Sequence, residues 1–145
     1  MEALRFAFDV RCAPEHAFEV WTHRMDSWWP RDHTVGPAET VTLQPTLGGR
    51  IYERDAAGVE HDWGVVTAWE PPTRLAYTWH LGRDPDQATD VEIRFLPAEP
   101  GTTRVEVEQS GFDRFGDQAD VWQARNRVGW DSLVSPFSRA VERSA

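Results

Sequence analysis

The longest regular segment that the sequence predicts is a helix over residues 117–142. Its apolar stripe recurs at helical spacing and consists of Trp122, Gly129, Trp130, Leu133, Phe137 and Val141. Asp117 can cap the first turn, with Asp120 three residues later, and Pro136 is expected to bend the last turns rather than end them. At 1.5 Å per residue, about 26 residues span roughly 39 Å. Such a helix can cross a whole small domain.

Upstream of this helix, the pattern predicts short strands and two short helices. Residues 4–8 alternate as a first strand, Pro14 suits the start of a first helix, and Pro30 ends a second helix over residues 25–29. Six further strands are expected at residues 40–43, 50–54, 61–69, 75–81, 91–95 and 104–108. The short turns between them predict an antiparallel meander. In the strand 61–69 both alternating sets contain apolar residues, so neither face can be assigned to the core.

The element order β-α-α-β6-α predicts an α+β fold in which a curved seven-stranded antiparallel sheet wraps around the long C-terminal helix. The clean alternation in most strands predicts one buried face, and only the last helix is long enough to cover it. One helix is about 10 Å wide, whereas seven strands at about 4.8 Å each are roughly three times wider. The sheet must therefore curl around the helix, leave a void, or do both.

Composition narrows the function classes. The 145 residues fit a single domain over residues 1–145, and a net charge of −9 opposes binding to nucleic acid or anionic lipid. No apolar run is long enough for a membrane span, and the N-terminus lacks the pattern of a signal peptide. Cys12 is the single cysteine, which excludes an internal disulfide and suits a cytoplasmic protein. We expect it to be a core residue rather than a reactive thiol.

Motifs for common site chemistry are absent from the sequence. The five histidines lack zinc-ligand spacing, and there is neither a nucleophile elbow nor a glycine-rich phosphate loop before a helix. No metal, cofactor or catalytic residue is therefore assigned. Glu106 and Glu108 alternate with Val105 and Val107, so their side chains are expected on the solvent-exposed face of the sheet. Glu53 shares parity with Ile51 and is the one carboxylate expected to point inward.

Eight tryptophans favour either a heavy core or an aromatic-lined cavity. The candidate cavity residues are Trp28, Trp29, Tyr77, Trp79, Ile93, Phe95, Trp122, Asn126, Trp130 and Leu133. For each of them, plain core packing is the alternative. The Asn126 amide falls on the apolar stripe and needs a partner, which is either a ligand or a strand residue. Gly129 costs about 1 kcal/mol relative to alanine in a helix, which indicates close approach to the sheet or room for a ligand.

Meander topology predicts where the cavity opens. The loops expected at one end of the sheet are residues 55–58, 82–88 and 111–116. The long helix also starts there, which places Trp122 and Asn126 near the mouth. The helical pair is expected to close the other end near Phe137 and Val141.

Several motifs carry a resemblance to a known family. They are Ala13-Pro14-Glu15, Trp28-Trp29-Pro30, Leu47-Gly48-Gly49-Arg50-Ile51, Trp63-Gly64-Val65-Val66, Trp69-Glu70-Pro71-Pro72-Thr73-Arg74-Leu75 and Gly129-Trp130. With the element order, they make the chain resemble the START-related helix-grip superfamily, SRPBCC. Within it, the chain is most similar to the branch named for homology to the activator of the heat-shock-protein-90 ATPase. The resemblance implies a hydrophobic ligand cavity between sheet and helix.

Three functions remain open. The favoured one is binding of a small hydrophobic or aromatic molecule, or a lipid, without assigned catalysis. The second is an enzyme of the cyclase, aromatase or dehydratase kind, which needs an acid–base pair inside the same cavity. The third is a co-chaperone-like interaction module, acting as a homodimer or with a chaperone partner. It would place Trp63 or Trp69 on the outer face of the sheet.

Overall fold

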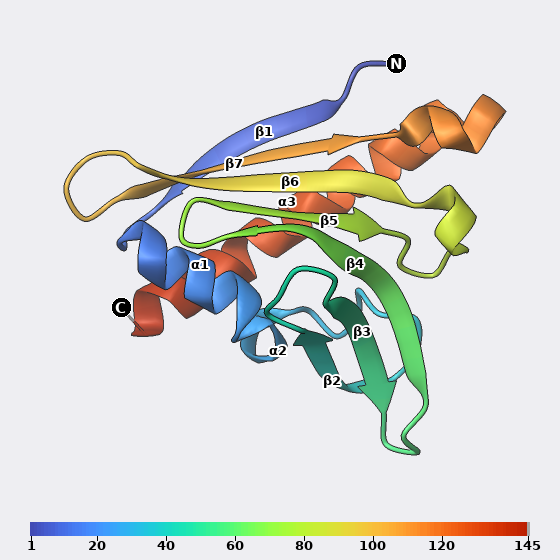
Figure 1. Ribbon diagram of the computed structural model, residues 1–145, viewed down its shortest axis with the longest axis horizontal. Helices are drawn as coiled ribbons and strands as arrows, with labels where there is room; N and C mark the ends of the chain where they lie inside the picture. Colours follow the sequence, from blue (N-terminus) through green and yellow to red (C-terminus); the bar gives the residue numbers. More distant parts are fainter. Residues whose placement is uncertain (145) are drawn as a thin grey trace.

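One antiparallel sheet of seven strands wraps around the C-terminal helix in the computed structural model, which describes residues 1–144 (Figure 1). The strands are β1 (Leu4–Val10), β2 (Ala38–Leu43), β3 (Arg50–Asp55), β4 (Glu60–Glu70), β5 (Arg74–Trp79), β6 (Thr89–Pro97) and β7 (Thr103–Ser110). The helices are α1 (Pro14–Thr22), α2 (Met25–Trp28) and α3 (Ala119–Ser144), with 3-10 helices η1 (Pro85–Gln87) and η2 (Phe112–Gln118). The predicted α+β helix-grip fold is confirmed. None of the helices within residues 1–144 has the length and apolar character that a membrane crossing requires.

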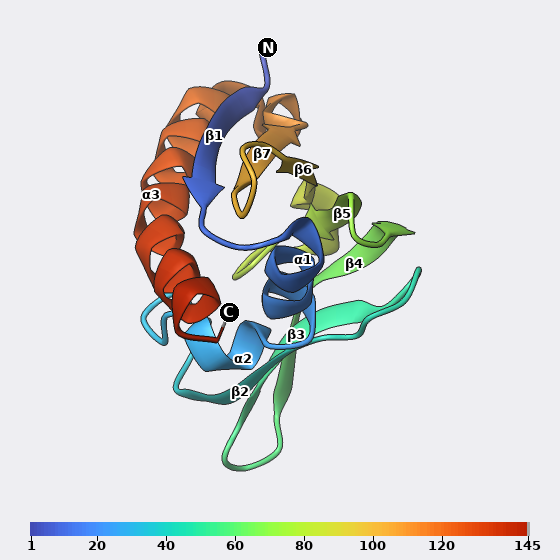
Figure 2. The ribbon, with the colours of Figure 1, turned by 90° about the vertical axis from the view of Figure 1, so that its left-hand side faces the viewer.

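The strands follow the order β1-β7-β6-β5-β4-β3-β2, so the first strand closes the meander by pairing with the last. Figure 2 shows α3 along one side, with α1 and α2 between its C-terminal end and the curved sheet. In β7, Val105 and Val107 are buried, while Glu106 and Glu108 point outward and form ion pairs with Arg104 and Arg5. The outward direction of these two carboxylates agrees with their parity in the sequence.

Strand β4 has an irregular register, which explains its ambiguous pattern. Ile51 pairs with Gly64 and Tyr52 with Asp62, so Trp63 is an extra residue in the ladder. This bulge turns Trp63 fully into the core, where it is 0% exposed. Trp63 therefore gives no support to the interaction-module alternative, which would have Trp63 or Trp69 on the outer face of the sheet. A second register shift follows between Val66 and Ala68.

Gly64 is required by the close approach of β5 at this bulge. A Cβ atom on Gly64 would lie 1.8 Å from the carbonyl oxygen of Thr78. Trp69, at the far end of β4, is only half-buried and packs edge-on against Phe18 of α1, with ring centroids 5.1 Å apart.

The α-helix α3 begins at Ala119, later than the sequence indicated. Residues 112–118 form η2 instead, which the non-helical backbone of Gly116 (φ 57°, ψ −124°) interrupts before α3 begins. Asp117 therefore lies before the start of α3 and is not its N-cap. The helix continues through Pro136 to Ser144.

Aromatic side chains fill the closed end of the fold. Phe137 of α3 is completely buried and contacts Trp21 at 4.9 Å and Trp28 at 5.2 Å between ring centroids. These two tryptophans come from α1 and α2, so the helical pair supports the C-terminal half of α3. Edge-to-face contacts of this kind fix ring orientation as well as burying area.

Candidate functional site

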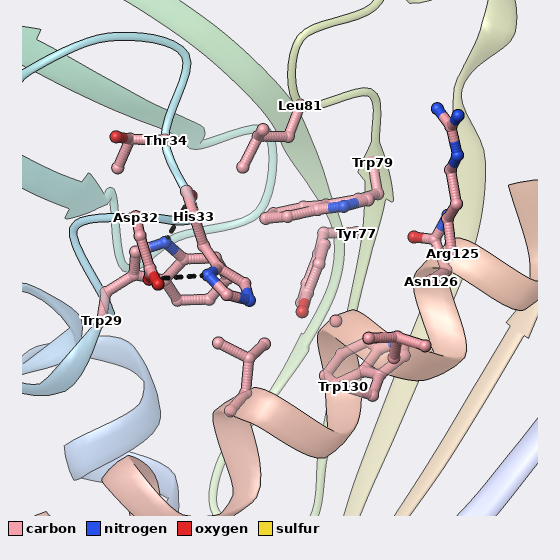
Figure 3. A pocket seen from close by; sticks show the side chains of 13 residues that line it. Trp29, Asp32, His33, Thr34, Tyr77, Trp79, Leu81, Arg125, Asn126 and Trp130 are labelled. Atoms are coloured by element: carbon pink, nitrogen blue, oxygen red, sulfur yellow. Dashed lines mark hydrogen bonds and ion pairs between the residues drawn. The ribbon is translucent and has the colours of Figure 1, made fainter.

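A cavity of about 370 Å³ lies between α3, the end of β5 and the loop that follows α2 (Figure 3). Its lining consists of Trp29, Asp32, His33, Thr34, Tyr77, Trp79, Leu81, Arg125, Asn126, Val128, Gly129, Trp130 and Leu133. The volume falls within the range of sites for small molecules. The cavity is the strongest candidate for a functional site in this fold.

The structure brings six of the ten candidate residues together around this cavity. They are Trp29, Tyr77, Trp79, Asn126, Trp130 and Leu133. The other four lie elsewhere. Ile93 and Phe95 are completely buried, and Phe95 packs against Phe18 of α1, because α1 covers this part of β6. Trp28 faces the closed end, and Trp122 stacks on Phe115 of η2 at 5.4 Å.

A buried glutamine joins α3 to the sheet beside the cavity. Gln109 of β7 is 0% exposed; its amide N–H groups donate to Thr89 Oγ1 at 2.8 Å and to Asn126 Oδ1 at 3.1 Å. Its oxygen accepts a hydrogen bond from Trp130 Nε1 at 2.8 Å. The Asn126 amide therefore finds its partner on a strand, and the same network fixes Trp130 in the cavity wall.

Gly129 provides room rather than close approach. A Cβ atom at this position would meet no heavy atom within 4 Å, and the residue lines the cavity. Glycine in a helix costs about 1 kcal/mol relative to alanine. No close backbone contact compensates for this cost. We therefore conclude that Gly129 keeps this part of the cavity open.

The hydroxyl of Tyr77 is a polar group among apolar walls. It points into the cavity from β5 (Figure 3). Burial raises the pKa of Tyr77, so the phenol stays protonated, and the nearby indole N–H of Trp21 acts against that rise. Within residues 1–144, Trp21 Nε1 completes no hydrogen bond. This deep part of the cavity thus offers a hydrogen-bond donor to a ligand oxygen.

The buried carboxylate of Glu53 anchors the loop at the cavity rim. Glu53 is 1% exposed and accepts hydrogen bonds from Trp63 Nε1 at 2.8 Å and from the backbone N–H groups of Val35 at 2.5 Å and Gly36 at 3.1 Å. Glu53 points inward, as its parity with Ile51 indicated, but its role is to hold the loop. Three charge-assisted bonds make this anchor strong.

A titratable pair lies on the same loop. Asp32 Oδ1 and His33 Nδ1 are 2.9 Å apart, and the other ring nitrogen of His33 faces the cavity toward Tyr77 (Figure 3). The hydrogen bond from His33 lowers the pKa of Asp32. The backbone oxygen of His33 accepts a hydrogen bond from Trp29 Nε1 at 2.9 Å, which fixes the backbone from which the imidazole extends. The side chains of Asp32 and His33 are 84% and 27% exposed, so the carboxylate orients the imidazole from the solvent side of the cavity.

The sequence reasoning did not find Asp32 and His33. They follow Trp28-Trp29-Pro30 in a loop without periodicity, and only that adjacency to the aromatic motif could have drawn attention to them. Within residues 1–144, no three His, Cys, Asp or Glu side chains gather in a way that could hold a metal ion.

On the side of the cavity opposite Asp32, the lining residue Arg125 meets Arg83, which lies outside the lining, at the ring of Trp122. The guanidinium carbon of Arg83 lies 3.2 Å from the ring centroid of Trp122, and that of Arg125 lies 4.7 Å from the same centroid. Arg125 lines the cavity and extends beside Trp79 (Figure 3). The rim is therefore acidic on the loop after α2 and basic at the start of α3.

The comparisons with known proteins agree with this architecture. A family model described as "Activator of Hsp90 ATPase homolog 1-like protein" matches residues 11–142. Among solved structures, the anthrahydroquino-γ-pyrone synthase Txn09, determined in a complex, is 36% identical, with 86% of each chain covered and a TM-score of 0.61. The self-sacrificing resistance protein CalC from Micromonospora echinospora is 28% identical over 99% of this chain and 96% of its own, with a TM-score of 0.77.

A third structure, protein MLL2253 from Mesorhizobium loti, is 22% identical over 99% of both chains with a TM-score of 0.74, and supports the fold alone. A comparison with curated protein sequences gave no match. The family model covers nearly the whole described chain, including α1, strands β2 to β7 and most of α3. The protein therefore belongs to the Activator of Hsp90 ATPase homolog 1-like family.

Proposed function

We propose that this protein binds a planar aromatic small molecule in the cavity beneath α3. The observation that carries the proposal is an open cavity of about 370 Å³ with Trp29, Tyr77, Trp79 and Trp130 in its walls. Trp79 contacts Trp29 at 5.6 Å and Tyr77 at 5.7 Å between ring centroids, so three rings form one continuous surface. Trp130 lies across the cavity, held by its hydrogen bond to Gln109.

These walls are preorganised, which lowers the cost of binding. Each ring packs on other rings or is fixed by a hydrogen bond, so little side-chain entropy remains to be lost. Burial of about 250 Å² of apolar ligand surface contributes roughly 6 kcal/mol before the cost of association. We therefore expect dissociation constants on the order of micromolar to millimolar for simple bicyclic aromatics. The name of the relative Txn09 adds support, since it denotes synthesis of an anthrahydroquino-γ-pyrone.

The binding test uses tryptophan fluorescence with 2-naphthol and anthraquinone as aromatic probes and palmitate as the lipid probe. We expect the aromatic probes to quench fluorescence saturably and palmitate to bind more weakly. Gly129→Phe fills the cavity and should abolish binding, whereas Val121→Phe adds the same ring to an exposed position on α3 and should not. Circular dichroism checks that both variants fold. Binding to Gly129→Phe equal to that of the unmodified protein would refute the proposal.

A second function is favoured by the pair Asp32 and His33: proton abstraction in a cyclisation reaction within the same cavity. The ring nitrogen of His33 that faces the cavity would take a proton from a carbon flanked by two carbonyl groups, while Asp32 orients the ring. The electron pair of the C–H bond then moves to a carbonyl oxygen, which gives an enolate, and Asp32 stabilises the imidazolium. The hydroxyl of Tyr77 can donate a hydrogen bond to that oxygen.

This second function is tested by deuterium exchange at the acidic carbon of 2-acetyl-1-tetralone, followed by NMR. General-base catalysis typically contributes about 10²-fold or more, so His33→Gln should lose most of any acceleration. His23→Gln, a histidine outside the cavity lining, is the matched control. Equal exchange rates with the unmodified protein and His33→Gln would exclude His33 as the base. The interaction-module alternative has less support, because Trp63 is buried and Trp69 is partly covered by Phe18.

A further inference from the structure

Arg83 and Arg125 place two positive charges against the indole ring of Trp122; Arg125 lines the cavity, whereas Arg83 and Trp122 lie outside its lining. Their guanidinium carbons lie 3.2 Å and 4.7 Å from the Trp122 ring centroid. Stacking on the ring explains the position of Arg83, because cation–π contacts favour this geometry. Arg125 also lies within cation–π distance of this ring, but it is exposed, borders the cavity and adds a like charge nearby.

Neither arginine has an acidic partner in the described part of the chain. Within residues 1–144, no carboxylate oxygen forms an ion pair with Arg83 or Arg125, although other arginines are paired, as Arg114 is with Asp90 at 2.9 Å. Burial, together with the charge of Arg125, lowers the pKa of Arg83. The protein carries a net charge of −9, so carboxylates are abundant elsewhere. Two adjacent cations without a counter-charge favour an anion placed between them and the cavity.

We infer that the ligand of this cavity is an aromatic carboxylate, with its rings among the aromatic walls and its carboxylate at Arg125, while the neighbouring charge of Arg83 adds to the positive potential there. This inference rests on the proposed binding function and names the class of ligand. The orientation is fixed from both sides, since Asp32 on the opposite rim repels an anion (Figure 3). A guanidinium suits a carboxylate because its planar N–H groups match the two oxygens.

The test compares 2-naphthoate with 2-naphthamide, which has the same rings and shape but no charge. By titration calorimetry at low ionic strength, we expect the carboxylate to bind about fivefold more tightly than the amide, the size of a favourable exposed ion pair. The preference should largely disappear at about 0.5 M salt, because exposed charges are screened. Arg125→Gln should abolish the preference, so that this variant binds 2-naphthoate and 2-naphthamide with equal affinity.

The matched control is Arg127→Gln, which removes the same charge from an exposed position of α3 outside the cavity lining and should retain the preference. Arg83→Gln should reduce the preference in part. If both compounds bind equally to the unmodified protein, the inference is wrong and the proposed binding function stands. If Arg125→Gln weakens both compounds equally, Arg125 shapes the cavity without recognising an anion, and the inference is again wrong. If neither compound binds, the inference and the proposed function both fall.

Discussion

Gly129 gives the sharpest test of whether the cavity exists in solution. Alanine at this position removes the helix penalty of glycine, and its methyl group would meet no atom within 4 Å. We therefore expect Gly129→Ala to raise the free energy of unfolding by about 1 kcal/mol and the Tm by about 4 °C. The added methyl takes little of the roughly 370 Å³, so ligand binding should persist.

Gly64→Ala is the matched control because it makes the same chemical change with the opposite native-state consequence. Its Cβ would lie 1.8 Å from the backbone oxygen of Thr78, so β4 and β5 would have to separate. We expect a loss of at least about 3 kcal/mol. The unfolded chain loses similar freedom in both variants, so the difference in sign comes from the folded state.

The assay is urea denaturation of both variants and the unmodified protein, followed by circular dichroism and tryptophan fluorescence. Coincident transitions by the two probes establish that unfolding is two-state and that the free energies can be compared. A destabilised Gly129→Ala protein would refute the reasoning. It would mean that the space beside Gly129 is occupied by protein atoms in solution and that the glycine serves packing after all.

Three further predictions concern individual buried groups. Glu53→Gln weakens three charge-assisted hydrogen bonds and should cost about 2–4 kcal/mol in urea denaturation, whereas Glu106→Gln on the wet face should stay within about 0.5 kcal/mol. Burial raises the pKa of Cys12 from 9.0 to about 11, so the contribution of this thiol to stability is complete below pH 9 and is lost as the pH rises toward 11. The free energy of unfolding of Cys12→Ala should therefore fall less between pH 9 and pH 11 than that of the unmodified protein. A series of unfolding curves at different pH values measures the difference. Burial likewise raises the pKa of Tyr77, so the alkaline absorbance titration of folded Tyr77→Phe should coincide with that of the unmodified protein, and a missing phenol transition in the variant would contradict this.

Alternation in the sequence was enough to predict the sheet and part of the cavity. Tyr77 and Trp79 were found through the pattern of their strand, and Asn126 and Trp130 through the apolar stripe of the helix. Alternation indicates that one face of a strand is buried but not which helix covers that face. Phe95 was therefore included among the candidate cavity residues, although α1 rather than α3 lies over it.

Other features lay beyond pattern reasoning for physical reasons. The bulge at Trp63 depends on the register between two strands, which the sequence of β4 alone does not encode. The rim loop has no periodicity, and its shape depends on Glu53, which lies 17 residues after Gly36 in the chain. Asp32 and His33 could therefore be placed at the cavity only once that long-range contact was known.

The width mismatch between one helix and seven strands is resolved differently at the two ends of α3. At the C-terminal half, α1 and α2 bring Trp21 and Trp28 against Phe137 and fill the space. Farther toward its N-terminus, residues 125–133 of α3 face the cavity, which separates them from the end of β5 and the loop after α2. Because Glu53 binds backbone N–H groups of the loop at Val35 and Gly36, it holds the loop's shape without using the side chains of residues 32–34. The Thr34 hydroxyl is bonded to the loop backbone at Arg31 and Gly36, so Asp32 and His33 are the two side chains of this segment that remain available to contact a ligand, and chemical selectivity is expected at this rim as well as at Arg125.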